Sequence, residues 1–141
     1  VCGSGLESVI HAARAILAAA TARRISDNAV VATVADTHPE NRSDSLIEWV
    51  MDERGLRADS VSYDSDRRRT VSAADLVVYL DSEETPDLPG RSFLRWDVPQ
   101  TDGMNAEQIR TFADDLEARV AGLLTDLDIP FVPLSAQRLA A

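Results

Sequence analysis

The sequence has no lysine and a single cysteine, and aromatic residues make up only 5% of its 141 residues. Because Cys2 has no cysteine partner in the chain, an internal disulfide framework and a metal cluster built on several cysteines are both excluded. No stretch approaches the roughly 18 apolar residues of a membrane-spanning helix. No basic segment followed by an apolar stretch opens the chain. We therefore expect a cytoplasmic protein that holds no metal and no cofactor.

Acidic residues are in large excess. The formal net charge is −10, all 14 basic residues are arginine, and the acidic residues are 16 aspartates and 8 glutamates. Such a surface repels polyanions, so we expect neither nucleic acid nor an anionic membrane as a partner. Two explanations stay open, an acidic surface adapted to a salt-rich cell and an ordinary acidic protein.

The hydrophobic pattern alternates between strands and helices. Helices are predicted at 7–22, 43–55 and 106–124, and strands at 29–34, 75–80 and 92–98. This alternation predicts an α/β domain of parallel strands with right-handed crossovers and helices on both faces, a three-layer sandwich. Only Val1 precedes Cys2, so we expect the first strand to be clipped. The alternative strand, 129–134, carries two prolines, which argue against a central position.

Three local expectations complete this pattern. Trp49 is expected beside the apolar stripe of the second helix, in the core. The charged residues 63–69 are expected to form a loop. The domain is expected to span 1–128, and the segment 129–141 is expected to be a tail that docks on its surface.

The first stretch of the chain is the strongest candidate for a site. Cys2 is followed by Gly3, Ser4 and Gly5, and then by Leu6, Glu7 and Ser8 as the first helix begins. A glycine-rich turn before a helix gathers backbone N–H groups, which bind anions. The same groups lower the pKa of a thiol, and the thiolate is the nucleophile. Residues 3–8 are therefore candidate anion ligands and Cys2 a candidate nucleophile, although a buried structural cysteine explains the loop equally well.

The order of features resembles the low-molecular-weight protein tyrosine phosphatase family, which includes thioredoxin-type arsenate reductases. The stretches that carry the resemblance are Val1–Gly5, Val34–Pro39, Glu53–Leu56, Ala74–Asp81, Trp96–Pro99 and the helix 106–124. The resemblance implies a four-stranded parallel sheet in the flavodoxin-like order 2-1-3-4. It also implies a phosphate-like anion or a phosphoprotein as the ligand; a protein partner stays unknown.

The same resemblance implies a mechanism, from which the chain departs at two points. In the family a cysteine thiolate attacks phosphorus, an arginine six residues later clamps the phosphoryl group, and an Asp-Pro pair supplies the general acid. Here Ser8 is the sixth residue after Cys2, and a loop one residue shorter puts Glu7 in the place of the arginine. Gln100-Thr101 stands where Asp-Pro is expected, so Asp102, or Asp97, replaces the acid only by a shift.

Both losses are large in energetic terms. A comparable arginine contributes roughly 10³–10⁵ to the rate in other phosphoryl-transfer sites. A carboxylate about 5 Å from a phosphate charge costs roughly 3 kcal/mol per unit charge at an effective dielectric constant of about 20. A missing general acid removes a further factor of about 10²–10⁴. We therefore expect a binding or regulatory module with impaired catalysis.

Two other functions stay open. The chain is an active phosphatase or an arsenate reductase if another group replaces the arginine; as a reductase it needs an external thiol, since Cys2 is the only cysteine. It is a phosphocysteine carrier if the Cys2 loop works like that of sugar-phosphotransferase IIB domains, which it also resembles.

Overall fold

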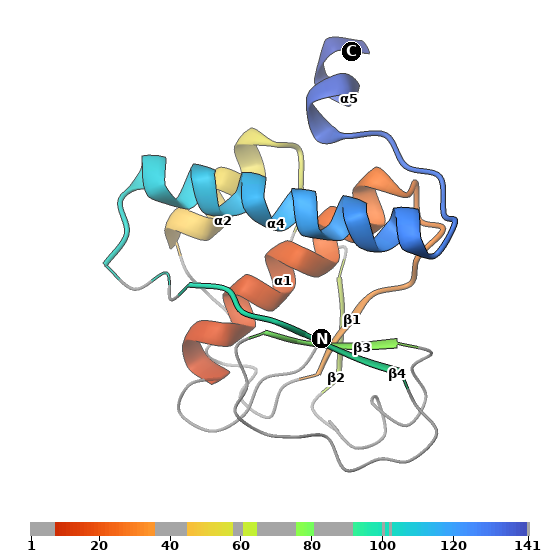
Figure 1. Cartoon of the computed structure of the whole chain (residues 1–141). Coiled ribbons are helices and arrows are strands. Elements are labelled where there is room, and N and C mark those ends of the chain that lie inside the picture. Colours follow the sequence, from red (N-terminus) through yellow and green to blue (C-terminus); the bar gives the residue numbers. More distant parts are fainter. Residues whose placement is uncertain are drawn as a thin grey trace.

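The computed structural model describes residues 8–35, 45–57, 61–64, 76–80, 92–99, 101 and 103–140 (Figure 1). Its helices are α1 (Ser8–Ile25), α2 (Ser45–Glu53), α4 (Ala106–Asp126) and α5 (Leu134–Ala140). Its strands are β1 (Thr33–Ala35), β2 (Ser62–Asp64), β3 (Leu76–Leu80) and β4 (Ser92–Trp96). The chain is therefore a mixed α/β protein, as the alternating pattern predicted.

The strands form two parallel pairs. β1 pairs with β2, with Thr33 opposite Ser62, and β3 pairs with β4, with Leu76 opposite Ser92. Parallel pairing requires long crossover connections, which fits the helices between the strands. Among the described residues no strand joins the two pairs. The four-stranded order 2-1-3-4 with a clipped first strand therefore stays a prediction.

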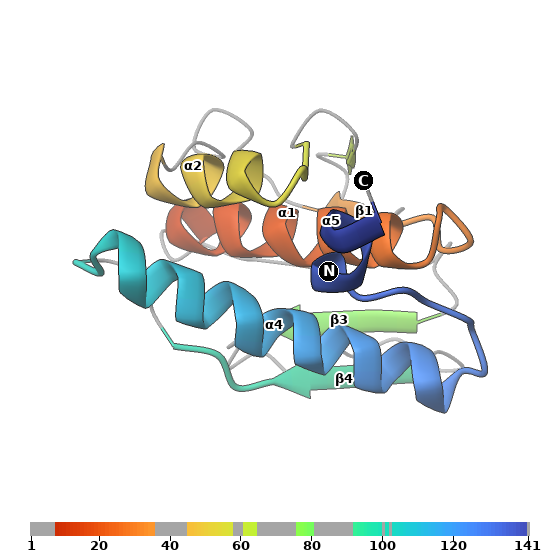
Figure 2. The same ribbon diagram turned by 90° about the horizontal axis from the view of Figure 1, so that it is seen from above.

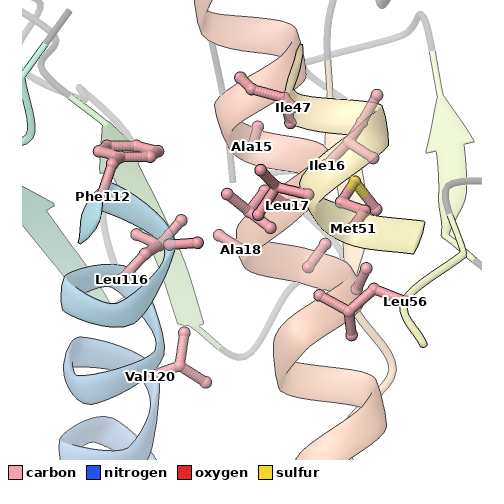
Figure 3. Packing of buried hydrophobic residues seen from close by; sticks show 14 of the residues in the cluster. Ala15, Ile16, Leu17, Ala18, Ile47, Met51, Leu56, Phe112, Leu116 and Val120 are labelled. Carbon is pink, nitrogen blue, oxygen red and sulfur yellow. The ribbon is translucent and has the colours of Figure 1, made fainter. Parts of the chain in front are cut away.

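Helix α1 is the centre of the core. It contacts α2, α4, β1 and β3, and its residues from Arg14 to Thr21 are buried without interruption. We expected a single apolar face, but small alanines let neighbours approach on every side, and a helix that is apolar all round is an interior helix. Figure 3 shows Ile47, Met51 and Leu56 packed on one side of α1, with Phe112, Leu116 and Val120 facing its other side.

Helices α1, α2 and α4 lie on the same side of β3 and β4 (Figure 1). Figure 2, seen from above, shows α1 between α2 and α4. No helix on the opposite face is among the described elements, so the three-layer arrangement is not confirmed. What the structure shows is a helical layer, centred on α1, that covers β3 and β4.

The contact between α2 and α4 is polar at its rim. Arg54 is buried and donates to the Asp114 carboxylate (2.7 Å) and to the Arg110 carbonyl oxygen (3.1 Å). Arg110 donates to both carboxylate oxygens of Glu53 (2.7 and 3.1 Å), which raises the pKa of Arg110 above its ordinary value. Its guanidinium lies 4.8 Å from the centre of the Trp49 ring, a cation–π contact.

The sequence led us to expect Trp49 in the core, but Trp49 is not a core residue. Its side chain is 45% exposed, and the buried stripe of α2 consists of Ile47, Val50 and Met51. Trp49 lies at the rim of the contact between α2 and α4, where its ring meets the Arg110 guanidinium, a position that suits its amphipathic ring.

The largest departures from the sequence predictions are at the end of α1, the start of β1 and the position of β2. α1 runs three residues further than expected, to Ile25, and Asp27 and Asn28 then take positive φ values (52° and 63°). Asn and Asp tolerate this left-handed conformation, and the turn delays β1 to Thr33. β2 lies at Ser62–Asp64, partly inside the segment expected to be a loop. A strand of three residues with polar ends carries no alternating apolar signal.

The C-terminal segment is docked on the end of α1. The Val132 N–H donates to the Ile25 carbonyl oxygen (2.9 Å), Arg24 Nε donates to Gln137 Oε1 (2.8 Å), and Leu134 is buried in the core cluster. Docking of the tail is thus confirmed, while a domain boundary at residue 128 stays a prediction. The helices that the structure describes include none long and apolar enough to cross a membrane.

Candidate oxyanion site

The predicted site falls largely outside the described part of the chain. Residues 2–7, which are the nucleophile candidate Cys2 and the anion ligands Gly3 to Glu7, lie outside it, and so does the acid candidate Asp102. Ser8 is described as the first residue of α1, and Asp97 as an exposed residue directly after β4. The structure therefore describes the elements that lead into and out of the predicted site.

The start of α1 faces the edge to which the strands point. Seen from above, the first turn of α1 lies on the side toward which the arrows of β3 and β4 are directed (Figure 2). Ser8, the sixth residue after Cys2, opens an 18-residue helix, and the N–H groups in the first turn of a helix have no partner within the helix itself. Ligands of open α/β sheets bind at this carboxyl edge, where the helix dipole favours negative charge.

The connection from β4 to α4 starts at the same edge and is held by two arginines. Three successive carbonyl groups, those of Asp97, Val98 and Pro99, accept hydrogen bonds from guanidinium groups. Arg119 Nη2 of α4 donates to the Asp97 oxygen (3.1 Å), and Arg14 Nη1 of α1 donates to the Val98 and Pro99 oxygens (3.3 and 2.8 Å). These bonds fix the connection between the two helices.

The far end of this connection is also fixed locally. The Met104 N–H donates to the Thr101 carbonyl oxygen (3.1 Å), and Gly103 has a φ of 79°, which a glycine adopts without strain. Asn105 then caps α4: its side chain accepts from the Gln108 N–H, and the Gln108 side chain accepts from the Asn105 N–H (both 2.9 Å). Such a reciprocal capping box determines where the helix begins.

Sequence reasoning missed Arg14, whose side chain is completely buried. Arg14 lies in an alanine-rich helix, beyond residues 3–8 in which the family resemblance led us to expect an arginine. A single arginine in such a helix is normally expected at the surface. No sequence signal marks it, because its partners are backbone carbonyl groups 84 and 85 residues away. The described residues include no group of three His, Cys, Asp or Glu side chains that could hold a metal ion.

The parallel strand pairs and the helices packed on them make the described part of the chain a mixed α/β domain. In structure, the chain is similar to a solved arsenate reductase in its reduced state, with a TM-score of 0.64 and 18% sequence identity over 79% of this chain and 88% of that one. No family model matches the sequence, and no curated protein matches it. At this identity the likeness shows the fold alone; it supports the α/β fold that the resemblance in the sequence implied, while the four-stranded order 2-1-3-4 stays a prediction.

Proposed function

We propose that the chain is an oxyanion-binding domain of the low-molecular-weight phosphatase fold, with Cys2 in its binding loop and with impaired catalysis. The observation that supports it best is the start of α1 at Ser8, directly after the Cys2 loop and at the edge to which β3 and β4 point. Tetrahedral anions such as phosphate and arsenate suit a ring of backbone N–H groups at a helix start.

Impaired catalysis follows from the residues that the loop lacks. None of the residues from Gly3 to Ser8 is basic, and Glu7 adds a negative charge. Backbone N–H groups alone bind an anion, but a phosphoryl group in its transition state spreads charge that a bidentate guanidinium stabilises far better. Affinity for an anion without turnover is the expected combination, and a phosphoprotein is the natural larger ligand of such a module.

Labelling of the single thiol tests the binding function. We expect inorganic phosphate and arsenate to slow the alkylation of Cys2 by iodoacetamide in a saturable way, while equal concentrations of chloride have no effect. Because the chain has one cysteine, every label reports the same site. Alkylation that stays equally fast at saturating phosphate and arsenate would falsify the binding function.

Hydrolysis of p-nitrophenyl phosphate tests the impairment. We expect the protein and its Cys2→Ser variant to show the same background rate, since losses of roughly 10³–10⁵ for the arginine and 10²–10⁴ for the acid multiply. Turnover that disappears in Cys2→Ser would show that another group neutralises the phosphoryl charge, and the domain would then be an active phosphatase.

The likeness to an arsenate reductase favours a second candidate, reduction of arsenate. Converting arsenate to arsenite takes two electrons, which two thiols supply as they form a disulfide. Cys2 is the only thiol of the chain, so the second must come from an external thiol. Arsenite release that requires both added glutathione and Cys2 would establish this activity; its absence leaves the binding function.

A further inference from the structure

Arg14 is an unusual residue for the centre of a helical core. Its side chain has 0% exposure, and it is followed on α1 by the buried residues Ala15, Ile16, Leu17 and Ala18. Taking a guanidinium out of water is costly unless hydrogen bonds satisfy it. A methionine of similar length would fill the same volume without that cost, so the structure gains something specific from the arginine.

What Arg14 holds is the backbone that leaves β4. Its Nη1 group donates to the carbonyl oxygens of Val98 and Pro99, two residues that lie between the acid candidates Asp97 and Asp102 in the sequence. Val98 is buried, and so is Thr101 two residues beyond Pro99. The bonds therefore link the helix that begins at the Cys2 loop to the segment that carries both acid candidates.

We propose that Arg14 is a positioning residue that fixes the β4–α4 connection on α1 and thereby sets the oxyanion affinity of the site. The inference rests on the proposed function of the Cys2 loop. Arg14 acts through the backbone of residues 98 and 99, and the anion itself is bound by the loop. Without the guanidinium, the buried hydrogen bond to the Val98 carbonyl oxygen and the partly buried one to the Pro99 carbonyl oxygen are lost, and the connection must move to find water or another donor.

Two other arginines serve as matched controls. Arg54 is also buried and also donates to a carbonyl oxygen, but its partners are on α4, so Arg54→Met removes a buried guanidinium without touching the connection. Arg119 is exposed and donates to the neighbouring Asp97 carbonyl oxygen. Because water replaces a donor that is lost at an exposed position, Arg119→Met tests the loss of an exposed hydrogen bond to the same segment.

The experiment measures protection of Cys2 from iodoacetamide by arsenate, together with hydrogen exchange of the amides in residues 97–105. For Arg14→Met we expect about tenfold weaker protection and faster exchange in this segment, as for a donor lost from buried and partly buried carbonyl groups. Arg54→Met should stay within about twofold of the unmodified protein, whereas Arg119→Met, which removes one exposed donor from the same segment, should weaken protection less than Arg14→Met does. Arg14→Lys, which keeps a charged donor, should recover part of the affinity.

Each outcome decides the proposal. Arsenate affinity and exchange that are unchanged in folded Arg14→Met overturn it, and so does an equal loss in Arg54→Met, which would mark a general effect of destabilisation. If Arg14→Met does not fold, the milder Arg14→Lys and Arg14→Gln decide by the same measurements. Failure of the unmodified protein to bind arsenate or phosphate overturns the proposed function; exchange of residues 97–105 then shows separately whether Arg14 fixes the connection.

Discussion

At the scale of single residues, the positive charge of this chain is carried entirely by arginine, and the structure uses the shape of its side chain. Arg14 reaches two carbonyl oxygens with one nitrogen, Arg54 joins a carboxylate to a carbonyl group, and Arg110 grips both oxygens of Glu53 while stacking on Trp49. A planar fork with five donors makes such multiple bonds, whereas an ammonium group is a compact, strongly hydrated charge. Replacing these arginines with lysine is therefore not conservative.

The ion pair between Arg54 and Asp114 yields a prediction with a definite asymmetry. The side chain of Arg54 is 8% exposed and that of Asp114 is 69% exposed. Asp114→Ala leaves a buried guanidinium without its carboxylate and should cost about 1–3 kcal/mol of unfolding free energy. Arg54→Met leaves a solvated carboxylate, removes one donor from the Arg110 carbonyl oxygen and fills the volume, so it should cost less, about 1 kcal/mol.

Urea denaturation of the two variants and of their double mutant measures both values and the coupling between the residues. Asp115→Ala, an exposed neighbour on α4, is the control for loss of a surface carboxylate. A larger loss in Arg54→Met than in Asp114→Ala would contradict the asymmetry.

At the scale of elements, the sequence predicted what local patterns encode. α4 was found almost to the residue from its apolar stripe, and the structure adds the capping box at Asn105 that determines its start. α1 was found, but its burial on all sides was not, because an alanine-rich pattern does not show how many neighbours approach. β2 was missed, since three residues with polar ends depend on a partner strand 29 positions away.

The same distinction applies to the site. The glycine-rich loop after Cys2 is a local pattern and is readable, although its geometry lies outside the described residues. The anchoring of Val98 and Pro99 by Arg14 is a contact across 84 and 85 residues, and no local pattern carries it. Tertiary hydrogen bonds to the backbone are the part of a site that a single sequence hides most completely.

The docked C-terminal element yields a prediction of its own. Leu134 of α5 is 2% exposed and belongs to the core cluster, whereas Val132 is 50% exposed. Leu134→Ala should therefore cost about 2–4 kcal/mol of unfolding free energy through lost burial and a cavity. Val132→Ala, the control, should cost less than about 1 kcal/mol. Thermal or urea unfolding measures both, and equal values would mean that the tail contributes nothing to the core.

At the scale of the whole molecule, the similarity in fold does not extend to the residues that carry the chemistry. The chain is similar in structure to an arsenate reductase over 79% of its length, yet residues 3–8 include no arginine, and Gln100-Thr101 stands where the sequence resemblance leads us to expect an Asp-Pro pair. A fold positions a loop at the carboxyl edge of a sheet whatever the loop contains, so function has to be argued from the loop itself. The overall charge of the molecule adds a second constraint on its ligands.

A net charge of −10 raises the concentration of cations around the molecule and opposes the approach of anions at low salt. Screening by salt removes both effects: the Debye length falls to about 10 Å at 0.1 M and about 3 Å at 1 M. Ordinary charge repulsion is therefore relieved almost completely below about 1 M. Stabilisation that continues above this concentration needs another cause, such as acidic side chains that retain hydrated potassium ions at the surface.

We propose that the surface is adapted to high salt, and thermal unfolding in potassium chloride tests this. The melting temperature should keep rising between about 1 and 3 M, by about 5 °C, which corresponds to roughly 1.5 kcal/mol in a domain of this size. A variant in which three exposed aspartates become asparagine, Asp52, Asp115 and Asp126, should lose part of that rise. A plateau reached below about 1 M in both proteins would show that the acidic surface is only screened. The anion measurements would then belong at moderate salt, because charge repulsion alone would govern the access of phosphate to the Cys2 loop.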